Sequence, residues 1–304
     1  MKNGILFVCA VLSAVCLIAF GSAEAHTLYI KPDSPVHQPN QIGVLKLVNG
    51  TFWKNEATIE HHRISRVTIV NPNGEAIEPD ESHLVQEGDI SKLELTYSQP
   101  GIYVVGVALK PRQIRVAAED FNYYLKYEGL LDDANERRNL KEGEVAAAER
   151  YTKFAKSIVW VDKAGTGDFS RVLGHRVEVI PLVNPGELRA GSIFRAQILK
   201  DGLPLTGELV YANTERMSET TEDGIFKELI AVRSDSDGVI EFQISEAGSW
   251  YVRFIHLSRL GDSAYWYSDL LVWLGLDDPA IPYESLWATL TFEVNQSPKN
   301  SETP

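Results

Sequence analysis

Short runs of alternating hydrophobic and polar residues recur along the first part of the chain and predict β-strands. Such runs cover residues 27–30, 42–48, 67–70, 93–97 and 102–109, and turn-forming segments rich in Asn, Gly and Pro separate them. Alternation is clearest in residues 92–97, as in a strand with one face exposed to water. Short strands at this spacing indicate a small antiparallel β-sandwich.

The strand pattern returns in the second half of the chain. Here the apolar runs cover residues 176–181, 192–199, 208–212, 239–244 and 250–256, with Asp-Gly turns at 201–202 and 237–238. This order of strands and turns is typical of an immunoglobulin-like or transthyretin-like sandwich. Residues 286–294 alternate as a last strand, and the aromatic segment before them predicts a covering loop with a helical turn at 267–274.

Between these two parts the period of the hydrophobic pattern becomes helical. Phe121, Tyr124 and Leu125 recur at helical spacing, and residues 142–155 are rich in Ala and Glu with an apolar stripe. We therefore expect a mainly β protein with two immunoglobulin-like or transthyretin-like β-sandwich domains joined by a short insert of two or three helices. The expected segments are a signal peptide (1–25), an N-terminal β-sandwich (26–112), a helical insert and connector (113–160), a C-terminal β-sandwich (161–257), an aromatic loop with the final strand (258–294) and a polar tail (295–304).

The first 25 residues resemble an export signal. Lys2 precedes an apolar run over residues 5–20, and the following Gly-Ser-Ala-Glu-Ala ends in the small-x-small pattern of a cleavage site. Cleavage before His26 would leave an exported protein without a membrane span, since no later apolar run reaches the ~18 residues that a transmembrane helix needs. Cys9 and Cys16 would leave with the signal, which excludes disulfides, thiolate metal sites and cysteine nucleophiles from the mature chain.

Composition and charge narrow the function only a little. The 304 residues are 44% hydrophobic and 23% charged, which is ordinary for a globular protein and excludes collagen-like and disordered classes. The net charge of -13 disfavours nucleic acid as a partner. An acidic surface is compatible with cation capture, and it also keeps exported proteins soluble.

His26 is the candidate ligand on which a metal site would be built. As a mature N-terminus it would present a free α-amine and an imidazole from one residue, so that both nitrogens could chelate one ion. Nitrogen donors favour nickel, copper or zinc over magnesium or calcium. The alternative is that the cleavage site merely happens to precede a histidine. All seven histidines would remain in the mature chain: His26, His37, His61, His62, His83, His175 and His256.

Three other histidines are candidate metal ligands. His256 ends an apolar strand, where a side chain can lead into a loop-built pocket, although it can equally be a packed histidine. His62 belongs to an adjacent pair of which only one member can face a shared site. His83 lies in an acidic loop with Glu81 and Glu87. No nucleophile elbow, HExxH motif or phosphate-binding glycine loop is present, so we expect a protein that is not an enzyme.

Eight segments in order along the chain resemble a known family. The chain is similar to exported bacterial proteins with a domain of unknown function, DUF4198, often described as periplasmic components of nickel or cobalt uptake systems. The matching segments are AHTLYIKP (25–32), LVNGTF (47–52), DFNYYLKYEGL (120–130), ERYTKFAKSIV (149–159), LGHRVEVIPLVNP (173–185), DGLPLTGELVYA (201–212), GSWYVRFIHL (248–257) and YESLWATLTFEV (283–294).

The resemblance implies a periplasmic protein that binds a divalent transition metal, nickel or cobalt first and copper or zinc as possible ions, and passes it to an inner-membrane uptake transporter. His26 and His256 correspond to family histidines, and Leu257 replaces a family methionine, which makes a copper(I) site less attractive. Two alternatives remain. One is a non-catalytic immunoglobulin-like scaffold or adhesion module that binds a protein or a glycan. The other is a copper enzyme with a histidine brace built on His26.

Overall fold

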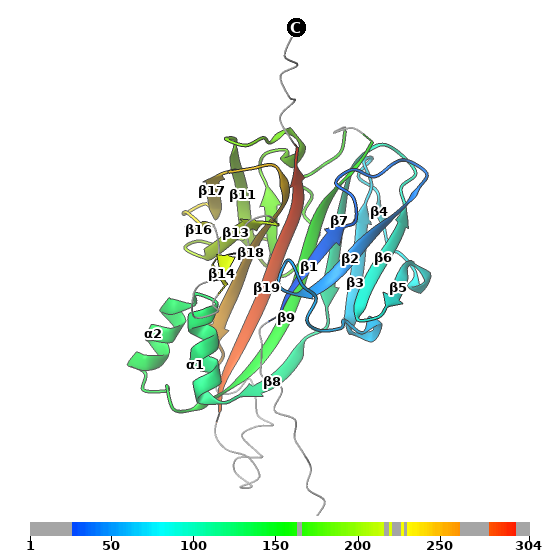
Figure 1. The fold of residues 1–304 in the computed structure, drawn as a ribbon. Coiled ribbons are helices and arrows are strands. Elements are labelled where there is room, and N and C mark those ends of the chain that lie inside the picture. Colours follow the sequence, from blue (N-terminus) through cyan, green and yellow to red (C-terminus); the bar gives the residue numbers. More distant parts are fainter. Residues whose placement is uncertain are drawn as a thin grey trace, which may run out of the picture.

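The fold is organised around one long sheet that extends through both sandwiches. A computed structural model describes residues 26–162, 166–215, 219–220, 226–227, 230–261 and 280–295. The long sheet has nine strands in the order β16-β13-β18-β19-β9-β7-β3-β4, and β8 pairs with β9 beside it. Two smaller sheets, β1-β2-β6-β5 and one built from β10, β11, β12 and β17, pack on it (Figure 1).

The elements have the following bounds. The strands are β1 (Thr27–Pro32), β2 (Ile42–Gly50), β3 (Ile64–Val70), β4 (Ala76–Ile77), β5 (Leu84–Glu87), β6 (Ile90–Thr96), β7 (Gly101–Leu109), β8 (Arg112–Val116), β9 (Ala146–Val161), β10 (Val177–Pro181), β11 (Ile193–Lys200), β12 (Leu203–Pro204), β13 (Leu209–Thr214), β14 (Glu219–Thr220), β15 (Phe226–Lys227), β16 (Ile230–Arg233), β17 (Val239–Gln243), β18 (Gly248–Arg259) and β19 (Ala280–Val294). The helices are α1 (Ala118–Tyr127) and α2 (Leu131–Asn139), with single 3-10 turns at His61–Arg63, Glu81–His83 and Pro185–Glu187.

The two smaller sheets cover opposite faces of the long sheet. On β7, the side chains of Val105 and Val107 belong to the core under the β1-β2-β6-β5 sheet. The side chains of Ile102 and Val104 belong instead to the core under β10 and β11. Because successive side chains of a strand point to opposite faces, one sheet supplies a wall of both hydrophobic cores. The expected mainly β class built from β-sandwiches is confirmed, and the two sandwiches share this sheet.

The helical insert is shorter than the sequence pattern predicts. Helix α1 forms as expected and buries Phe121, Tyr124 and Leu125 against the lower ends of β18 and β19 (Figure 1). Helix α2 occupies part of the stretch expected as a connector. Residues 142–155 were expected to be helical, which is wrong, because Ala146–Val161 form β9 at the centre of the sheet. Both faces of β9 are covered, so most of its residues are buried and the alternation that marks a strand is lost.

Strand β1 fixes the first sandwich against the long sheet. Its carbonyl groups at Leu28 and Ile30 do not face β2 and instead accept hydrogen bonds from the hydroxyl groups of Thr289 (2.7 Å) and Thr291 (2.6 Å) on β19. These threonines satisfy the otherwise unpaired edge of the strand. The C-terminal part of β1 therefore lies over β19 and forms one wall of a groove whose floor is β9 and β19.

The remaining expectations are met in part or fall outside the described residues. The predicted last strand at 286–294 lies within β19. The signal peptide, the helical turn at 267–274 and nearly all of the polar tail lie outside the described residues. Among the described helices, neither combines the length and the apolar composition that crossing a membrane requires.

Candidate functional site

The two principal candidate ligands, His26 and His256, each lie beside a different carboxylate. The Nδ1 atom of His26 is 3.2 Å from Oε2 of Glu56, and both side chains are partly exposed. The Nδ1 atom of His256 is 2.7 Å from Oε2 of Glu208. Val210 on β13 pairs with Phe254 on β18, and Glu208 and His256 lie two residues beyond this pair. Each imidazole is thus held by a nearby acid.

The long sheet separates these two histidines. His256 is paired with Leu286 in the β18–β19 register, and Leu286 belongs to the core that faces β10 and β11. His26 precedes β1, which lies on the opposite face over Thr289. Paired residues of antiparallel strands point to the same face, so the side chains of His26 and His256 lie on opposite sides of the sheet. The structure does not bring them into one site, and His256 does not supply the second imidazole of a histidine brace.

The two lower-ranked candidates each lie beside a further acid. The Nε2 atom of His62 is 3.4 Å from Oε2 of Glu60, and its side chain is 71% exposed. His83 contacts Asp80 (2.9 Å from Nδ1 to Oδ1) at a 3-10 turn. In the part of the chain that the structure describes, no group of three or more His, Cys, Asp or Glu side chains is arranged to hold a metal ion.

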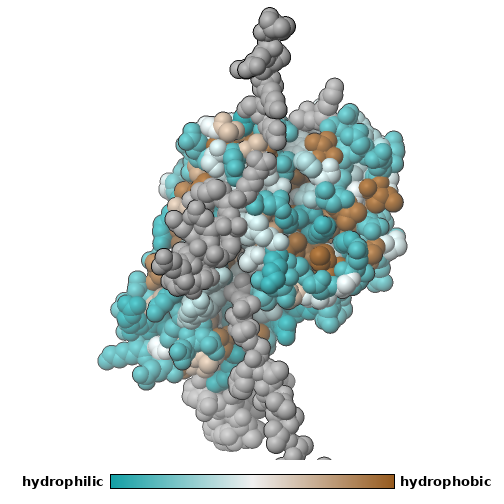
Figure 2. Space-filling view, viewed as in Figure 1, coloured by the Kyte–Doolittle hydropathy of each residue, from teal (hydrophilic) through white to brown (hydrophobic). Residues whose placement is uncertain are grey.

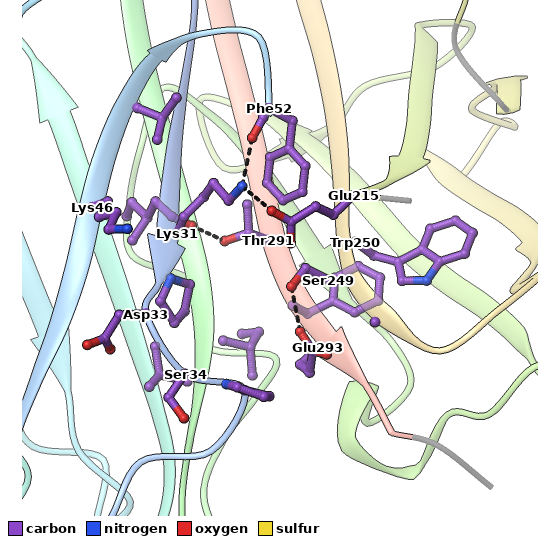
Figure 3. Close-up of a pocket in the computed structure, with 18 of the residues that line it drawn as sticks. Lys31, Asp33, Ser34, Lys46, Phe52, Glu215, Ser249, Trp250, Thr291 and Glu293 are labelled. Carbon is purple, nitrogen blue, oxygen red and sulfur yellow. Dashed lines mark hydrogen bonds and ion pairs between the residues drawn. The ribbon is translucent and has the colours of Figure 1, made fainter. Parts of the chain in front are cut away.

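A groove of about 740 Å³ lies at the seam between the two sandwiches. Its floor is formed by β9 and β19, one wall by β1 and β2, and the other wall by the end of β13 and the start of β18 (Figure 3). Its lining includes five aromatic residues, of which Trp53 is partly exposed and the others are buried: Phe52, Trp53, Trp160, Trp250 and Phe292. Clefts of this size with an aromatic lining and a few polar groups are typical ligand sites.

A set of contacts between the walls closes one part of this groove. Lys31 donates through Nζ to the backbone carbonyl of Phe52 (2.8 Å) and forms an ion pair with Oε1 of Glu215 (2.8 Å). Its Nζ atom also lies 4.4 Å from the centre of the Phe52 ring. Trp53 donates from Nε1 to the backbone carbonyl of Glu215 at 2.6 Å. These four residues, which we call the seam clasp, connect the loop after β2 to the end of β13.

Other polar side chains of the groove are held in place by local hydrogen bonds. Ser249 donates to Oε2 of Glu293 at 2.7 Å, and Asp33 accepts from the backbone N–H of Val44 at 3.2 Å. Lys46 on β2 is exposed at the groove margin. The groove therefore combines the partly exposed Trp53 ring with hydroxyl groups and charges of both signs (Figure 3).

His37 lies behind the Asp33 side of the groove and does not line it. Its ring is packed on Tyr97, with ring centres 4.9 Å apart. Burial lowers the pKa of the His37 imidazole, and the Asp33 carboxylate, 3.8 Å from Nδ1, partly opposes that shift. His37 is thus a neutral packing residue near neutral pH.

The groove residues carry no motif by which the sequence could have identified them. They come from segments far apart in the chain, and only the threading of β1 over β19 brings them together. The available signal was the pair of aromatic residues directly after a predicted strand, Phe52 and Trp53, in a segment that is otherwise polar. Trp53 is partly exposed, whereas Phe52 is buried, and exposed aromatic residues in connecting loops often mark binding sites.

Solved structures show only remote similarity to this chain. A D0-D1 domain of intimin has 11% identity and a TM-score of 0.20, with 88% of this chain and 97% of that chain covered. A DUF4785 family protein from Legionella pneumophila has 8% identity and a TM-score of 0.24, with 73% and 50% covered. The chitinase ChiW from Paenibacillus has 13% identity and a TM-score of 0.21, and the alignment covers 29% of this chain and 8% of the chitinase. At these scores none of them supports an argument about function.

Sequence comparison identifies the family. The curated proteins contain no match to this chain. The family described as "Domain of unknown function (DUF4198)" matches residues 23–258, which is more than half of the chain and spans β1 to β18. The chain therefore belongs to the DUF4198 family.

Proposed function

We propose that this chain is an exported, non-catalytic binding protein that takes a glycan in the seam groove. The observation that carries the proposal is Trp53, a partly exposed indole whose N–H is held by the carbonyl of Glu215 inside a groove that also contains acidic and basic side chains. A sugar ring has an apolar face of C–H groups and a rim of hydroxyls. An aromatic ring beside fixed carboxylates and hydroxyls matches both features.

The rigidity of the groove also favours a binding role. Lys31, Glu215, Ser249 and Glu293 already make hydrogen bonds or ion pairs with one another or with the backbone. Side chains that are ordered before a ligand arrives lose less conformational entropy on binding. The open shape of the groove would allow a chain of sugar residues to extend beyond it.

Calorimetric titration of the mature protein with a panel of soluble oligosaccharides tests this proposal. We expect Trp53→Ala to weaken binding at least about tenfold, because the ring face that stacks on the sugar is removed. The matched control is Tyr123→Ala on α1, an aromatic residue that is 59% exposed and does not line the groove. Failure of every oligosaccharide to bind, or equal losses in the two variants, would contradict the proposal, and selective binding of peptides would reassign the groove.

A second candidate function is the periplasmic capture of a transition metal for an inner-membrane uptake transporter. The observation that favours it is the distance of 3.2 Å between Nδ1 of His26 and the Glu56 carboxylate at the start of β1. If export cleavage exposes the α-amine of His26, this place offers two nitrogen donors and one oxygen donor. Such a mixed set suits nickel or cobalt first, with copper and zinc as the other ions.

Titration of the processed protein with nickel, cobalt, copper and zinc tests the second function. His26→Ala and Glu56→Gln should each weaken binding of the preferred ion by at least about tenfold. His62→Ala serves as the control because its side chain is largely exposed and lies beside Glu60, not Glu56. His256→Ala should have no effect, since His256 lies on the other face of the sheet. Binding that depends on His256 and not on Glu56 would refute this arrangement.

A further inference from the structure

A second cavity, of about 430 Å³, lies between the two helices and the segment that follows them. Lys126 on α1, Arg138 on α2 and Lys141 after α2 line it together with Glu144 and Asn122. Three cationic side chains therefore face one carboxylate. The cavity is separate from the seam groove, because the two sites have no lining residue in common.

This local excess of positive charge contrasts with the rest of the protein. The chain has a net charge of -13, so an average surface region should be acidic. The corner formed by α1 and α2 is predominantly hydrophilic on the face shown in Figure 2. Cations gathered around a concave site raise the local potential and attract anions even when the whole protein repels them.

A buried guanidinium behind the cavity adds to this charge. Arg137 is 1% exposed, and its Nη1 atom has no hydrogen-bond partner in the described part of the chain. Its Nε atom donates to Oδ1 of Asn122 at 2.8 Å, its Nη2 donates to the carbonyl of Val145, and its guanidinium lies 5.3 Å from the centre of the Phe121 ring. No carboxylate pairs with it within the described residues. The Tyr283 side chain also hydrogen-bonds to Arg137. Arg137 does not itself line the cavity, but it adjoins the lining residues Asn122 and Arg138 and adds positive charge beside them.

The contacts of Arg137 also shape the cavity wall. Asn122 accepts from Arg137 and donates through Nδ2 to the carbonyl of Gly143 at 2.7 Å, so both ends of its amide are fixed. This links α1 to α2 and to the segment after α2. Lys126, Arg138 and Lys141 therefore extend from a backbone that is held by a buried network, and the cavity is a built feature of the helical corner.

We propose that this cavity binds a phosphate-bearing anion. The three cations come from different elements. They therefore match a phosphate group, which has several oxygens and a charge of about −2, better than they match a single carboxylate. A volume of about 430 Å³ accommodates a small phosphorylated molecule or the headgroup of an anionic phospholipid. The phosphate is the chemistry that both sources share. The site does not depend on the glycan groove or on His26.

Two measurements on the mature chain distinguish the sources. Calorimetry with inorganic phosphate, at constant ionic strength, reports the free anion. Co-sedimentation with phosphatidylglycerol vesicles, compared with phosphatidylcholine vesicles, reports a lipid headgroup. Phosphate binding without vesicle binding supports a soluble phosphorylated ligand, and selective binding to phosphatidylglycerol vesicles supports a lipid. If neither saturable phosphate binding below about 10 mM nor selective vesicle binding occurs, the proposal is overturned.

Charge variants decide whether the bound anion occupies this cavity. Arg138→Glu and Lys141→Glu should each reduce affinity at least about tenfold, whereas Lys110→Glu, an exposed cation that does not line the cavity, should change it less than about twofold. Glu144→Gln should strengthen binding, and Glu78→Gln, an exposed acid elsewhere, should not. Circular dichroism verifies that each variant is folded. Equal effects of the cavity variants and their controls would show a general charge effect and overturn the proposal.

Discussion

Lys31 on β1 and Glu215 after β13 form an ion pair of 2.8 Å that spans 184 residues of sequence and joins the two walls of the seam groove. Glu215 is 48% exposed, so water screens the pair and its contribution to folding is small. We expect Glu215→Ala to lower the free energy of unfolding by less than about 1 kcal/mol in urea titrations. The same change should alter ligand affinity in the groove, because it releases the Lys31 amine from one of its partners.

The backbone contact of Glu215 provides the control for that prediction. The Trp53 indole donates to the carbonyl of Glu215, and this bond does not need the Glu215 side chain. Glu215→Ala should therefore leave Trp53 in place, with an unchanged fluorescence maximum. If Glu215→Ala lowered the free energy of unfolding by several kcal/mol, the seam clasp would be a main support of the fold and not a feature of the groove.

A buried ion pair is expected to contribute in a different way. Lys156 on β9 and Glu178 on β10 are 1% and 2% exposed, and they pair between the long sheet and the smaller C-terminal sheet. The carboxylate of Glu178 also accepts from the backbone N–H of Leu173 at 2.8 Å and of Gly174 at 3.2 Å. Removing one charge leaves the other buried and unpaired. We expect Lys156→Met to destabilise the protein by about 3–5 kcal/mol.

A double-mutant cycle tests this explanation. The combination Lys156→Met with Glu178→Leu should be less destabilising than the sum of the single changes, because no uncompensated charge remains. The exposed pair Arg195 and Glu241 on β11 and β17 is the comparison, with side chains 50% and 59% exposed. Arg195→Met should cost less than about 1 kcal/mol. Additive losses at Lys156 and Glu178 would contradict the proposed coupling.

His175 should make the stability of the protein depend on pH between about 4 and 6.5. Burial is the main reason why the pKa of the His175 imidazole is lowered to about 4; Glu178 opposes this shift, and Lys156 and Arg66 contribute to it. The folded state therefore holds this group neutral, whereas the unfolded chain binds a proton with a pKa near 6.5. The stability that results is fully present above about pH 6.5 and is lost as the pH falls toward 4, by roughly 3 kcal/mol at most.

Unfolding of the variant His175→Leu measures this contribution. The difference in unfolding free energy between wild type and variant should change with pH over that window and stay constant above it. His62→Leu is the control, since its side chain is 71% exposed and should show no such slope. The Nε2 atom of His175 has no hydrogen-bond partner among the described residues, so the change to leucine breaks no hydrogen bond at that atom. A pH-independent difference would mean that His175 protonates in the folded state.

The sequence pattern identified the strands that have one wet face, and it identified the fully buried β7 by its continuous apolar run, but it missed β9. Residues 92–97 alternate because β6 is covered on one side, and this strand was predicted. β9 is enclosed between two sheets, and it does not show the alternation of a half-exposed strand. Its segment is rich in Ala and Glu, and this composition led to the prediction of a helix. Local helix propensity is weak compared with the burial of a central strand.

The site could be predicted less well because it depends on strand register. The sequence placed His256 at the end of a strand, whereas β18 continues to Arg259, and only the pairing of His256 with Leu286 shows which face the imidazole occupies. Lys31 directly follows the predicted strand at 27–30, and its partner Glu215 lies in the other sandwich. A one-residue shift in register would reverse every such assignment. Candidate histidines could therefore be named, whereas their neighbours could not.

Gly129, in the turn between α1 and α2, provides a test of how the helical corner is held against the long sheet. Its φ of +73° lies in the left-handed region, and a Cβ atom there would overlap the hydroxyl oxygen of Tyr211 on β13. We expect Gly129→Ala to destabilise the protein by more than about 2 kcal/mol, because it combines backbone strain with a clash. Gly74→Ala, at φ +83° with no heavy atom within 4 Å of the new Cβ, isolates the backbone component and should cost about 1 kcal/mol.

Pairing Gly129→Ala with Tyr211→Phe separates the steric component. Removing the hydroxyl oxygen should restore part of the stability lost at Gly129, because the nearest contact then disappears and the next atom, Cζ of the ring, is 2.9 Å from the new Cβ. Thermal unfolding of the four proteins in this cycle gives the coupling directly. If Gly129→Ala costs no more than Gly74→Ala, the turn does not press against β13. The helices would then be attached to the sheet mainly through the α1 side chains Phe121 and Leu125.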